Sequence, residues 1–116
     1  MMDDELLAEI KRRVLGWPGT TSESGRFHSV AFRYGKREIG HVHRDGVADL
    51  PVTPEMREEV LSKGRASSHR AGSKGYISYP VEDSEDVSAV LDILGRNYER
   101  AKAAADRRAA SLNDDA

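Results

Sequence analysis

The chain has 116 residues, 38% of them hydrophobic and 33% charged, and its 18 basic and 20 acidic residues leave a formal net charge of −2. This length suits a single domain with one modest hydrophobic core. The sequence contains no cysteine, which excludes disulfides, thiolate nucleophiles, cysteine-ligated zinc and iron–sulfur clusters.

Three other classes of protein are disfavoured by the same composition. The sequence has no run of about 18 apolar residues, so it predicts no membrane-spanning helix. Its acidic first residues and their short apolar cluster predict no secretory signal, and we expect a cytoplasmic protein. The near-neutral charge disfavours a protein whose main role is to coat nucleic acid.

An amphipathic helix is predicted first, because apolar side chains recur between residues 6 and 14 with the 3.6-residue period. Asp3 or Asp4 is expected to be its N-cap. The Gly-Trp-Pro-Gly segment at 16–19 ends it, since proline and glycine favour a turn. The polar stretch Thr20 to Gly25 is predicted to be a loop.

Three strands are predicted next, because residues 30–34 alternate between apolar and polar side chains with a period of two. Gly35-Lys36 is a candidate for a tight turn, and residues 37–43 form the returning strand. Asp45-Gly46 predicts a second turn, and residues 47–50 a short third strand. Together these segments predict an antiparallel meander.

The second predicted helix has clear signals at both ends. Thr53 is a candidate N-cap, and Pro54 stands at the first helical position, where its missing N–H has no consequence. Gly64 stands where a left-handed residue commonly ends a helix. A weaker hairpin is predicted after it, with strands at about 65–70 and 76–81.

The last predicted helix begins behind Asp83 or Ser84 and carries a core-facing apolar stripe from Val87 to Tyr98. Beyond the stripe the sequence favours a helix but has few large apolar residues. We therefore expect one domain at residues 1–101, followed at 102–116 by a solvated helical extension and a frayed tail.

The predicted order of elements is α-β-β-β-α-β-β-α. Consecutive strands, rather than strict alternation with helices, favour the α+β class. We expect an antiparallel sheet of about five strands with the helices packed on one face. This order resembles that of double-wing domains, for which DNA binding has been suggested, and the resemblance concerns the fold.

Reactive side chains are concentrated in residues 40–51. On a strand, His41 and His43 point to the same face, about 6.6 Å apart at a rise of about 3.3 Å per residue. Asp45 lies at the predicted turn and Asp49 on the next strand, so either carboxylate could orient an imidazole.

Three interpretations of this segment stay open. One imidazole could act as a general base, or the donors could bind iron, manganese or zinc together with His28 or His69. Alternatively, the histidines are ordinary polar residues at the rim of a sheet. The turn by itself accounts for the presence of Asp45 and Gly46, because these residue types are common in turns. A catalytic role predicts that His41 and His43 line a concave pocket.

Several segments together resemble the luciferase-family proteins of bacteria, whose domain is also found in fungal luciferases. The resemblance extends from about Leu6 to Ala101, nearly the whole predicted domain. The segments that carry it are Trp17-Pro18-Gly19, Phe32 to Gly40, His41-Val42-His43 through Pro51, His69, Gly75 to Ser78 and Asn97 to Arg100.

This resemblance implies oxygenation of an enolisable small molecule without a cofactor and without a metal. A base removes a proton from the enol, and the resulting anion reacts with O₂. Carried over to this sequence, the catalytic residues are His41, His43 and Asp45. The substrate-binding residues, among them the arginines that would stabilise the enolate, are Arg33, Arg37, Arg44, Asp49 and His69.

The alternative hypothesis is a non-catalytic module that binds protein or nucleic acid. It predicts an exposed apolar or basic patch, and for nucleic acid an affinity that falls steeply with salt. The net charge of −2 makes nucleic acid the weaker choice of partner. The expected partner is therefore a small molecule. The sequence does not indicate whether the protein is a monomer or an oligomer.

Overall fold

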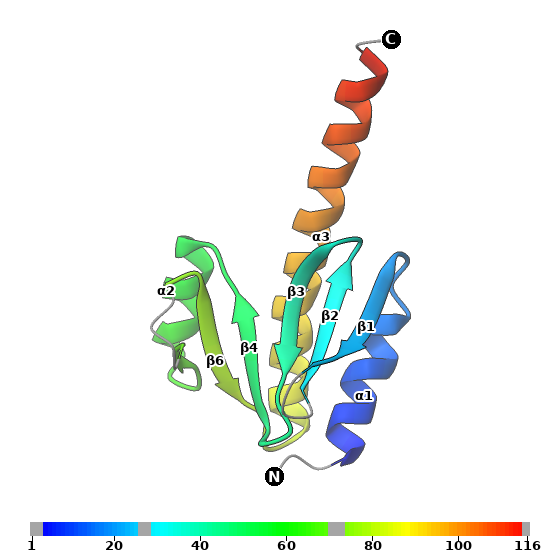
Figure 1. Ribbon diagram of the computed structural model, residues 1–116. Coiled ribbons are helices and arrows are strands. Elements are labelled where there is room, and N and C mark those ends of the chain that lie inside the picture. The colour runs from blue at the N-terminus through cyan, green and yellow to red at the C-terminus, as the bar shows by residue number, and fades with distance from the viewer. Residues whose placement is uncertain (1–3, 26–28, 70–73, 115–116) are drawn as a thin grey trace.

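A six-stranded antiparallel sheet with the strand order β1-β2-β3-β4-β6-β5 forms the centre of the computed structural model (Figure 1). The structure describes residues 4–25, 29–69 and 74–114. The strands are β1 (Thr20–Ser24), β2 (Val30–Tyr34), β3 (Arg37–Val42), β4 (Val47–Pro51), β5 (Ser67–Ser68) and β6 (Tyr76–Pro80). The helices are α1 (Asp4–Leu15), α2 (Pro54–Ser62) and α3 (Ser84–Asp114).

The predicted α+β class and antiparallel sheet are confirmed, but the sheet has six strands in place of about five. The additional strand is β1, where a loop was predicted; it pairs with β2 from Thr20 opposite Tyr34 to Ser24 opposite Val30. An edge strand needs only backbone partners on one side, so the polar side chains of β1 can stay exposed. Of the predicted strand at 65–70, only the two residues of β5 form a strand. Residue 70 lies outside the described residues, as does His28, one of the candidate metal ligands.

Local capping chemistry determines where α2 and α3 begin. The Thr53 side chain accepts a hydrogen bond of 3.1 Å from the backbone N–H of Met56, and Pro54 follows it, as predicted. Asp83 accepts a hydrogen bond of 2.9 Å from the backbone N–H of Asp86 and therefore caps α3. Gly64 has a φ of +85° after the last turn of α2, the conformation that the prediction required.

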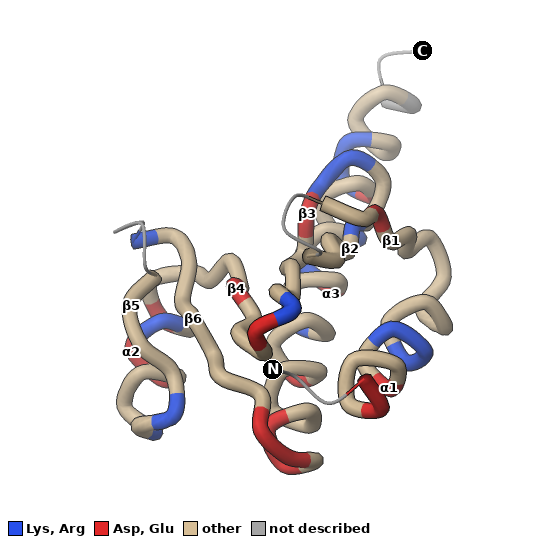
Figure 2. The backbone as a smooth tube through the Cα atoms, turned by 60° about the horizontal axis from the view of Figure 1, so that its bottom comes forward, with Lys and Arg blue, Asp and Glu red and all other residues tan. Residues whose placement is uncertain are grey.

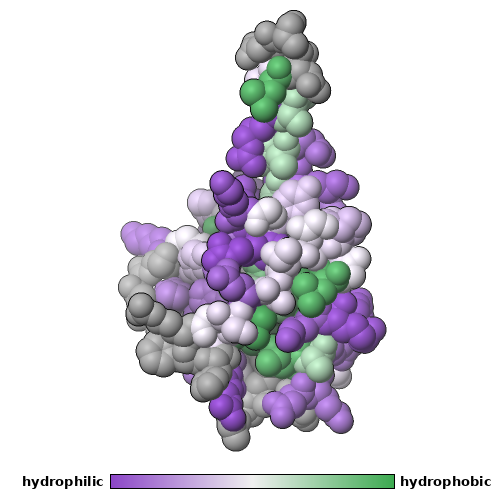
Figure 3. Space-filling model, turned by 45° about the vertical axis from the view of Figure 1, so that its right-hand side comes forward, coloured by the Kyte–Doolittle hydropathy of each residue, from purple (hydrophilic) through white to green (hydrophobic). Residues whose placement is uncertain are grey.

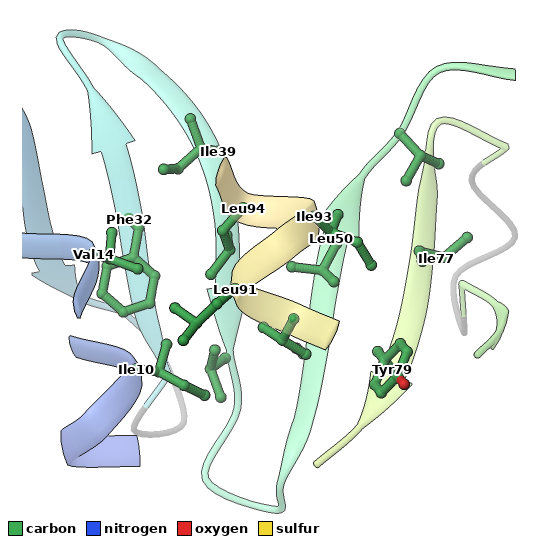
Figure 4. Packing of buried hydrophobic residues seen from close by; sticks show 14 of the residues in the cluster. Ile10, Val14, Phe32, Ile39, Leu50, Ile77, Tyr79, Leu91, Ile93 and Leu94 are labelled. Atoms are coloured by element: carbon green, nitrogen blue, oxygen red, sulfur yellow. The ribbon is translucent and has the colours of Figure 1, made fainter. Parts of the chain in front are cut away.

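The hydrophobic core lies between the sheet and the helices on one of its faces (Figure 1). Figure 4 shows Ile10 and Val14 of α1 beside Phe32 of β2, and Leu94 of α3 near Ile39 and Leu50. All of these side chains are at most 1% exposed. Burying a side chain of this kind stabilises the fold by about 1.5–3 kcal/mol, so this packing fixes which face of each strand points inward.

Helix α3 is 31 residues long and continues past the sheet, so its C-terminal part projects from the body of the molecule (Figures 1 and 3). Ala101 is 3% exposed, whereas Leu112 is 74% exposed. The helix has no break between residues 101 and 102, and the expected domain division there stays a prediction. No helix in the described part of the chain combines the length and apolar character that a membrane crossing requires.

Candidate functional site

The face of the sheet opposite the helices carries the polar side chains of three central strands. Ala48 and Leu50 of β4 are fully buried in the core, so the residue between them, Asp49, points to the other face. In register with it lie His41 of β3 and Ser78 of β6. The alternation of β-strands thus brings a carboxylate, an imidazole and a hydroxyl into one row across the sheet.

A β-bulge in β3 adds a second carboxylate to this face. In the pairing of β2 with β3, Phe32 is opposite Gly40 but Arg33 is opposite Glu38, so one residue of β3, Ile39, has no partner. Regular alternation would place Glu38 and His41 on opposite faces; the additional residue places them on the same face.

Two residues of the core accommodate the bulge. A Cβ atom on Gly40 would lie 2.6 Å from Cδ2 of Leu94 and 2.9 Å from Cδ2 of Leu50, so any side chain there would force these buried leucines to move. The Asn97 side chain donates hydrogen bonds of 3.0 Å to the carbonyl of Ile39 and 2.8 Å to the carbonyl of Pro51. Asn97 is 4% exposed, and it satisfies a backbone carbonyl at the bulge.

Three imidazoles converge on a single oxygen of Asp49. The distances from its Oδ2 are 2.5 Å to Nε2 of His43, 3.3 Å to Nε2 of His41 and 3.5 Å to Nε2 of His69. The carboxylate is 3% exposed, while the imidazoles are only about a quarter exposed or less. The rings of His41 and His43 are 4.9 Å apart and nearly perpendicular.

A second layer of polar groups holds these side chains. The hydroxyl of Ser78 donates a hydrogen bond of 2.7 Å to Oδ1 of Asp49. Oε2 of Glu38 lies 3.0 Å from Nδ1 of His41 and accepts a hydrogen bond of 2.9 Å from the hydroxyl of Tyr76. We call the seven residues Glu38, His41, His43, Asp49, His69, Tyr76 and Ser78 the Asp49 cluster.

The pKa values within the Asp49 cluster follow from these contacts. The hydrogen bond to Glu38 raises the pKa of His41 more than burial lowers it. The same bond from His41 lowers the pKa of Glu38 against the effect of burial, with help from Tyr76. Burial would raise the pKa of Asp49, but the hydrogen bonds from Ser78 and His43, together with the charges of His43 and His69, outweigh burial, and the pKa is below its ordinary value. Both carboxylates are therefore ionised at neutral pH.

Tyr76 complements this charge. Burial, followed by the hydrogen bond to Glu38, raises the pKa of Tyr76 to about 12. Its hydroxyl therefore remains a hydrogen-bond donor at neutral pH.

The structure separates the residues that the sequence singled out. His41, His43, Asp49 and His69 meet in the Asp49 cluster. Asp45, the remaining predicted catalytic residue, lies in the turn between β3 and β4. Its side chain there accepts a hydrogen bond of 3.0 Å from the backbone N–H of Val47.

The three candidate arginines lie in different places. Arg33 is opposite Glu38 in the sheet and pairs with Glu23 at 3.2 Å. Arg44 is exposed in the turn between β3 and β4. Arg37 lines a cavity beside the turn between β2 and β3, so of the three only Arg33 neighbours the Asp49 cluster.

Two of the hollows in the described part of the chain lie away from the imidazoles. One, of about 820 Å³, lies between α2 and α3 and is lined by Met56 and Leu91 among others. The other, of about 420 Å³, is the one lined by Arg37. Neither includes His41 or His43, so the predicted pocket at these rings stays a prediction.

The sequence patterns did not predict a role at this site for Glu38, Tyr76 and Ser78. A glycine inside a predicted strand is a signal for a bulge, and at Gly40 that signal could have placed Glu38 beside His41. Tyr76 and Ser78 alternate with apolar residues on β6, which indicates one polar face. Which strand lies beside β6, however, is not a local property of the sequence.

The donor set of the Asp49 cluster suits two kinds of chemistry. An imidazole oriented by a carboxylate can accept a proton from a substrate. Imidazole nitrogens and a carboxylate oxygen are also ligands for divalent transition metals. The ligand atoms of His41, His43 and Asp49 all lie within 4.8 Å of one another.

A comparison with protein families matches residues 36–97, more than half of the chain, to the family described as Luciferase domain. No curated protein and no solved structure matches the chain. The matched range contains every residue of the Asp49 cluster, whereas α1, β1 and β2 precede it.

Proposed function

The chain belongs to the luciferase domain family, and from this premise we propose that the Asp49 cluster binds an enolisable small molecule and starts its oxygenation without a cofactor. The observation that carries the proposal is the convergence of three imidazoles on the buried carboxylate of Asp49, inside the matched range. The face on which they lie is not covered by the described helices (Figure 1).

His43 is the proposed base. Its Nε2 lies 2.5 Å from Oδ2 of Asp49, so an N–H at this position donates to the carboxylate and leaves the lone pair on Nδ1. A carboxylate that fixes the tautomer of an imidazole in this way is a recurrent device of acid–base catalysis. The other carboxylate oxygen of Asp49 accepts a hydrogen bond from the hydroxyl of Ser78, which fixes the orientation of the carboxylate that holds His43.

His41 is the proposed stabiliser of the enolate. Its ring stands beside that of His43, and its Nδ1 is hydrogen-bonded to Glu38. The hydrogen bond to Glu38 raises the pKa of His41 and so favours its cationic form, and a cation beside the position where negative charge develops stabilises the anion more than the neutral substrate. Arg33, opposite Glu38 on the neighbouring strand, adds a positive charge near the same face.

The proposed reaction needs only the substrate and O₂. His43 accepts the proton from carbon, and the electron pair of the broken C–H bond remains in the enolate. The carbanion carbon then forms a bond to O₂, which is reduced to the level of a peroxide while the carbon is oxidised. The proton held by His43 returns to the peroxide oxygen, so the product is a hydroperoxide and the protein is unchanged.

Proton transfer can be tested separately from oxygenation. We propose to measure deuterium exchange at carbon by NMR for cyclic 1,3-diketones and α-hydroxyketones, in D₂O that contains EDTA, and O₂ consumption with an electrode. His43→Ala should slow exchange by about 100-fold or more, the usual contribution of a general base. The control is Glu58→Gln, an exposed residue of α2, which should exchange at the wild-type rate. Equal rates for wild type and His43→Ala across both substrate classes would refute the proposal.

The alternative, a non-catalytic module for protein or nucleic acid, has less support. Figure 2 shows lysines and arginines distributed over several elements of the chain, including α1, α2 and the C-terminal part of α3. Acidic residues gather at the beginning of α3. A nucleic-acid partner is favoured by basic residues that cluster on one face, and the described residues offer no observation that favours such a partner.

A further inference from the structure

We propose that the Asp49 cluster binds one divalent transition-metal ion, with the carboxylate of Asp49 and the imidazoles of His41 and His43 as ligands. The inference goes beyond the proposed function, because it concerns an equilibrium that needs no organic substrate. Three observations support it: the distances between the ligand atoms, the hydrogen bonds that orient the ligand side chains, and the combination of nitrogen and oxygen donors.

The spacing of three donors is close to that around a single ion. A tetrahedral ion with ligand bonds of about 2.0–2.1 Å separates neighbouring ligand atoms by about 3.3 Å. Nε2 of His41 lies 3.3 Å from Oδ2 of Asp49, and the ligand atoms of His41, His43 and Asp49 all lie within 4.8 Å of one another. Nε2 of His43 lies 2.5 Å from Oδ2 of Asp49, so metal binding requires this hydrogen bond to open. His69 also faces Oδ2 of Asp49, at 3.5 Å, but is not part of this compact set.

The second layer has the form that metal sites use. Imidazoles that bind a metal usually donate their other ring N–H to a carboxylate or carbonyl, which fixes the tautomer and the ring orientation. Nδ1 of His41 meets Glu38 at 3.0 Å, and Glu38 is in turn hydrogen-bonded by Tyr76. Oδ1 of Asp49 is hydrogen-bonded by Ser78, which leaves Oδ2 as the oxygen that faces the imidazoles.

The atoms themselves restrict the kind of ion. Two imidazole nitrogens and one carboxylate oxygen suit zinc, iron, copper or nickel, whereas magnesium and calcium prefer sets of oxygen atoms. The carboxylate is 3% exposed, so a cation there would be shielded from water and held by an unscreened charge. We therefore expect Zn²⁺ to bind and Mg²⁺ not to compete with it.

Metal binding and proton transfer draw on the same atoms. An ion on Asp49 and on Nε2 of His43 would replace the hydrogen bond that orients the proposed base. The two proposals fail independently: the exchange assay described above is run with EDTA, whereas metal binding is measured without any substrate.

Calorimetric titration with ZnCl₂ tests the inference on untagged protein that has been treated with EDTA and dialysed. We expect one Zn²⁺ per chain and no heat of binding for MgCl₂. Asp49→Ala, His41→Ala and His43→Ala should each weaken binding at least 100-fold. Glu38→Gln should weaken binding about 10- to 100-fold, the usual effect of substituting a residue that is hydrogen-bonded to a metal ligand. Glu58→Gln, at an exposed residue outside the Asp49 cluster, should bind Zn²⁺ like the wild type.

A second measurement does not depend on the variants folding. Co²⁺ added to the wild-type protein should give the intense visible absorption of a tetrahedral site, and one equivalent of Zn²⁺ should abolish it. Absence of one-to-one Zn²⁺ binding by the wild type would overturn the inference. So would Zn²⁺ affinity that is unchanged in Asp49→Ala and His43→Ala, because the ion would then be bound elsewhere.

Discussion

Replacing Gly40 with alanine tests whether the bulge in β3 depends on the absence of a side chain. Gly40 faces the core at the point where α3 crosses the sheet. An added Cβ would lie 2.6 Å from Cδ2 of Leu94 and 2.9 Å from Cδ2 of Leu50. Both leucines are fully buried, so neither can turn into solvent to make room.

The size of the effect follows from these distances. Non-bonded carbon atoms approach to about 3.5 Å, so the two leucines would have to move by roughly 0.6–0.9 Å. Overpacking of a well-filled core usually costs about 1–3 kcal/mol, and we expect about 2 kcal/mol for Gly40→Ala. For a domain of this size the corresponding decrease in Tm is about 8 °C.

Urea unfolding followed by circular dichroism measures this loss, and Gly95→Ala is the matched control. Gly95 lies inside α3, and a Cβ there would be 3.8 Å from the Trp17 ring, an ordinary contact. Alanine is the better helix former by about 0.8–1 kcal/mol, so Gly95→Ala should stabilise the protein. A Gly40→Ala variant as stable as the wild type would refute the account of the bulge.

Three further substitutions test single contacts by the same unfolding assay. Asn97→Ala should destabilise the fold by about 2–3 kcal/mol, because two carbonyls of the sheet lose their donor; a loss below about 0.5 kcal/mol would contradict this. Tyr98→Phe should cost about 1 kcal/mol through the lost 2.6 Å hydrogen bond to the Pro18 carbonyl, and no loss would show that the bond contributes nothing. Asp86→Asn should cost about 1–2 kcal/mol at pH 7, since Asp86 holds Arg65 through two hydrogen bonds. Burial would raise the pKa of Asp86, but Arg65 and the backbone hydrogen bonds to its carboxylate together outweigh burial and lower the pKa, so the cost of Asp86→Asn should shrink as the pH falls below about 4. A cost that is independent of pH would contradict this assignment.

Local signals in the sequence were sufficient for the helices. The cap at Thr53 and the left-handed glycine at 64 depend on neighbouring residues only, and the structure confirms both. Strand β1 was predicted to be a loop because apolar alternation is absent from residues 20–24. An edge strand is held by backbone hydrogen bonds to β2, and these carry no signature in the side chains.

The candidate site could be predicted only in part, for a related reason. His41, His43 and Asp49 lie within nine residues of one another, so strand periodicity sufficed to bring them together. His69 reaches Asp49 because β6 lies between β4 and β5 in the sheet, and this order depends on tertiary packing. Glu38 reaches His41 only through the bulge, whose signal was a single glycine.

The bulge couples the core to the candidate site. Gly40 and Asn97 supply no donor atom to the proposed metal site, yet Gly40 allows the bulge and Asn97 satisfies a carbonyl at it. Substitutions at both positions should therefore move Glu38 away from His41 and weaken Zn²⁺ binding. Tyr98→Phe removes a hydrogen bond at the other end of the sheet and should leave Zn²⁺ affinity unchanged. If all three variants lost affinity in proportion to stability, general loosening of the fold, and not the bulge, would explain the coupling.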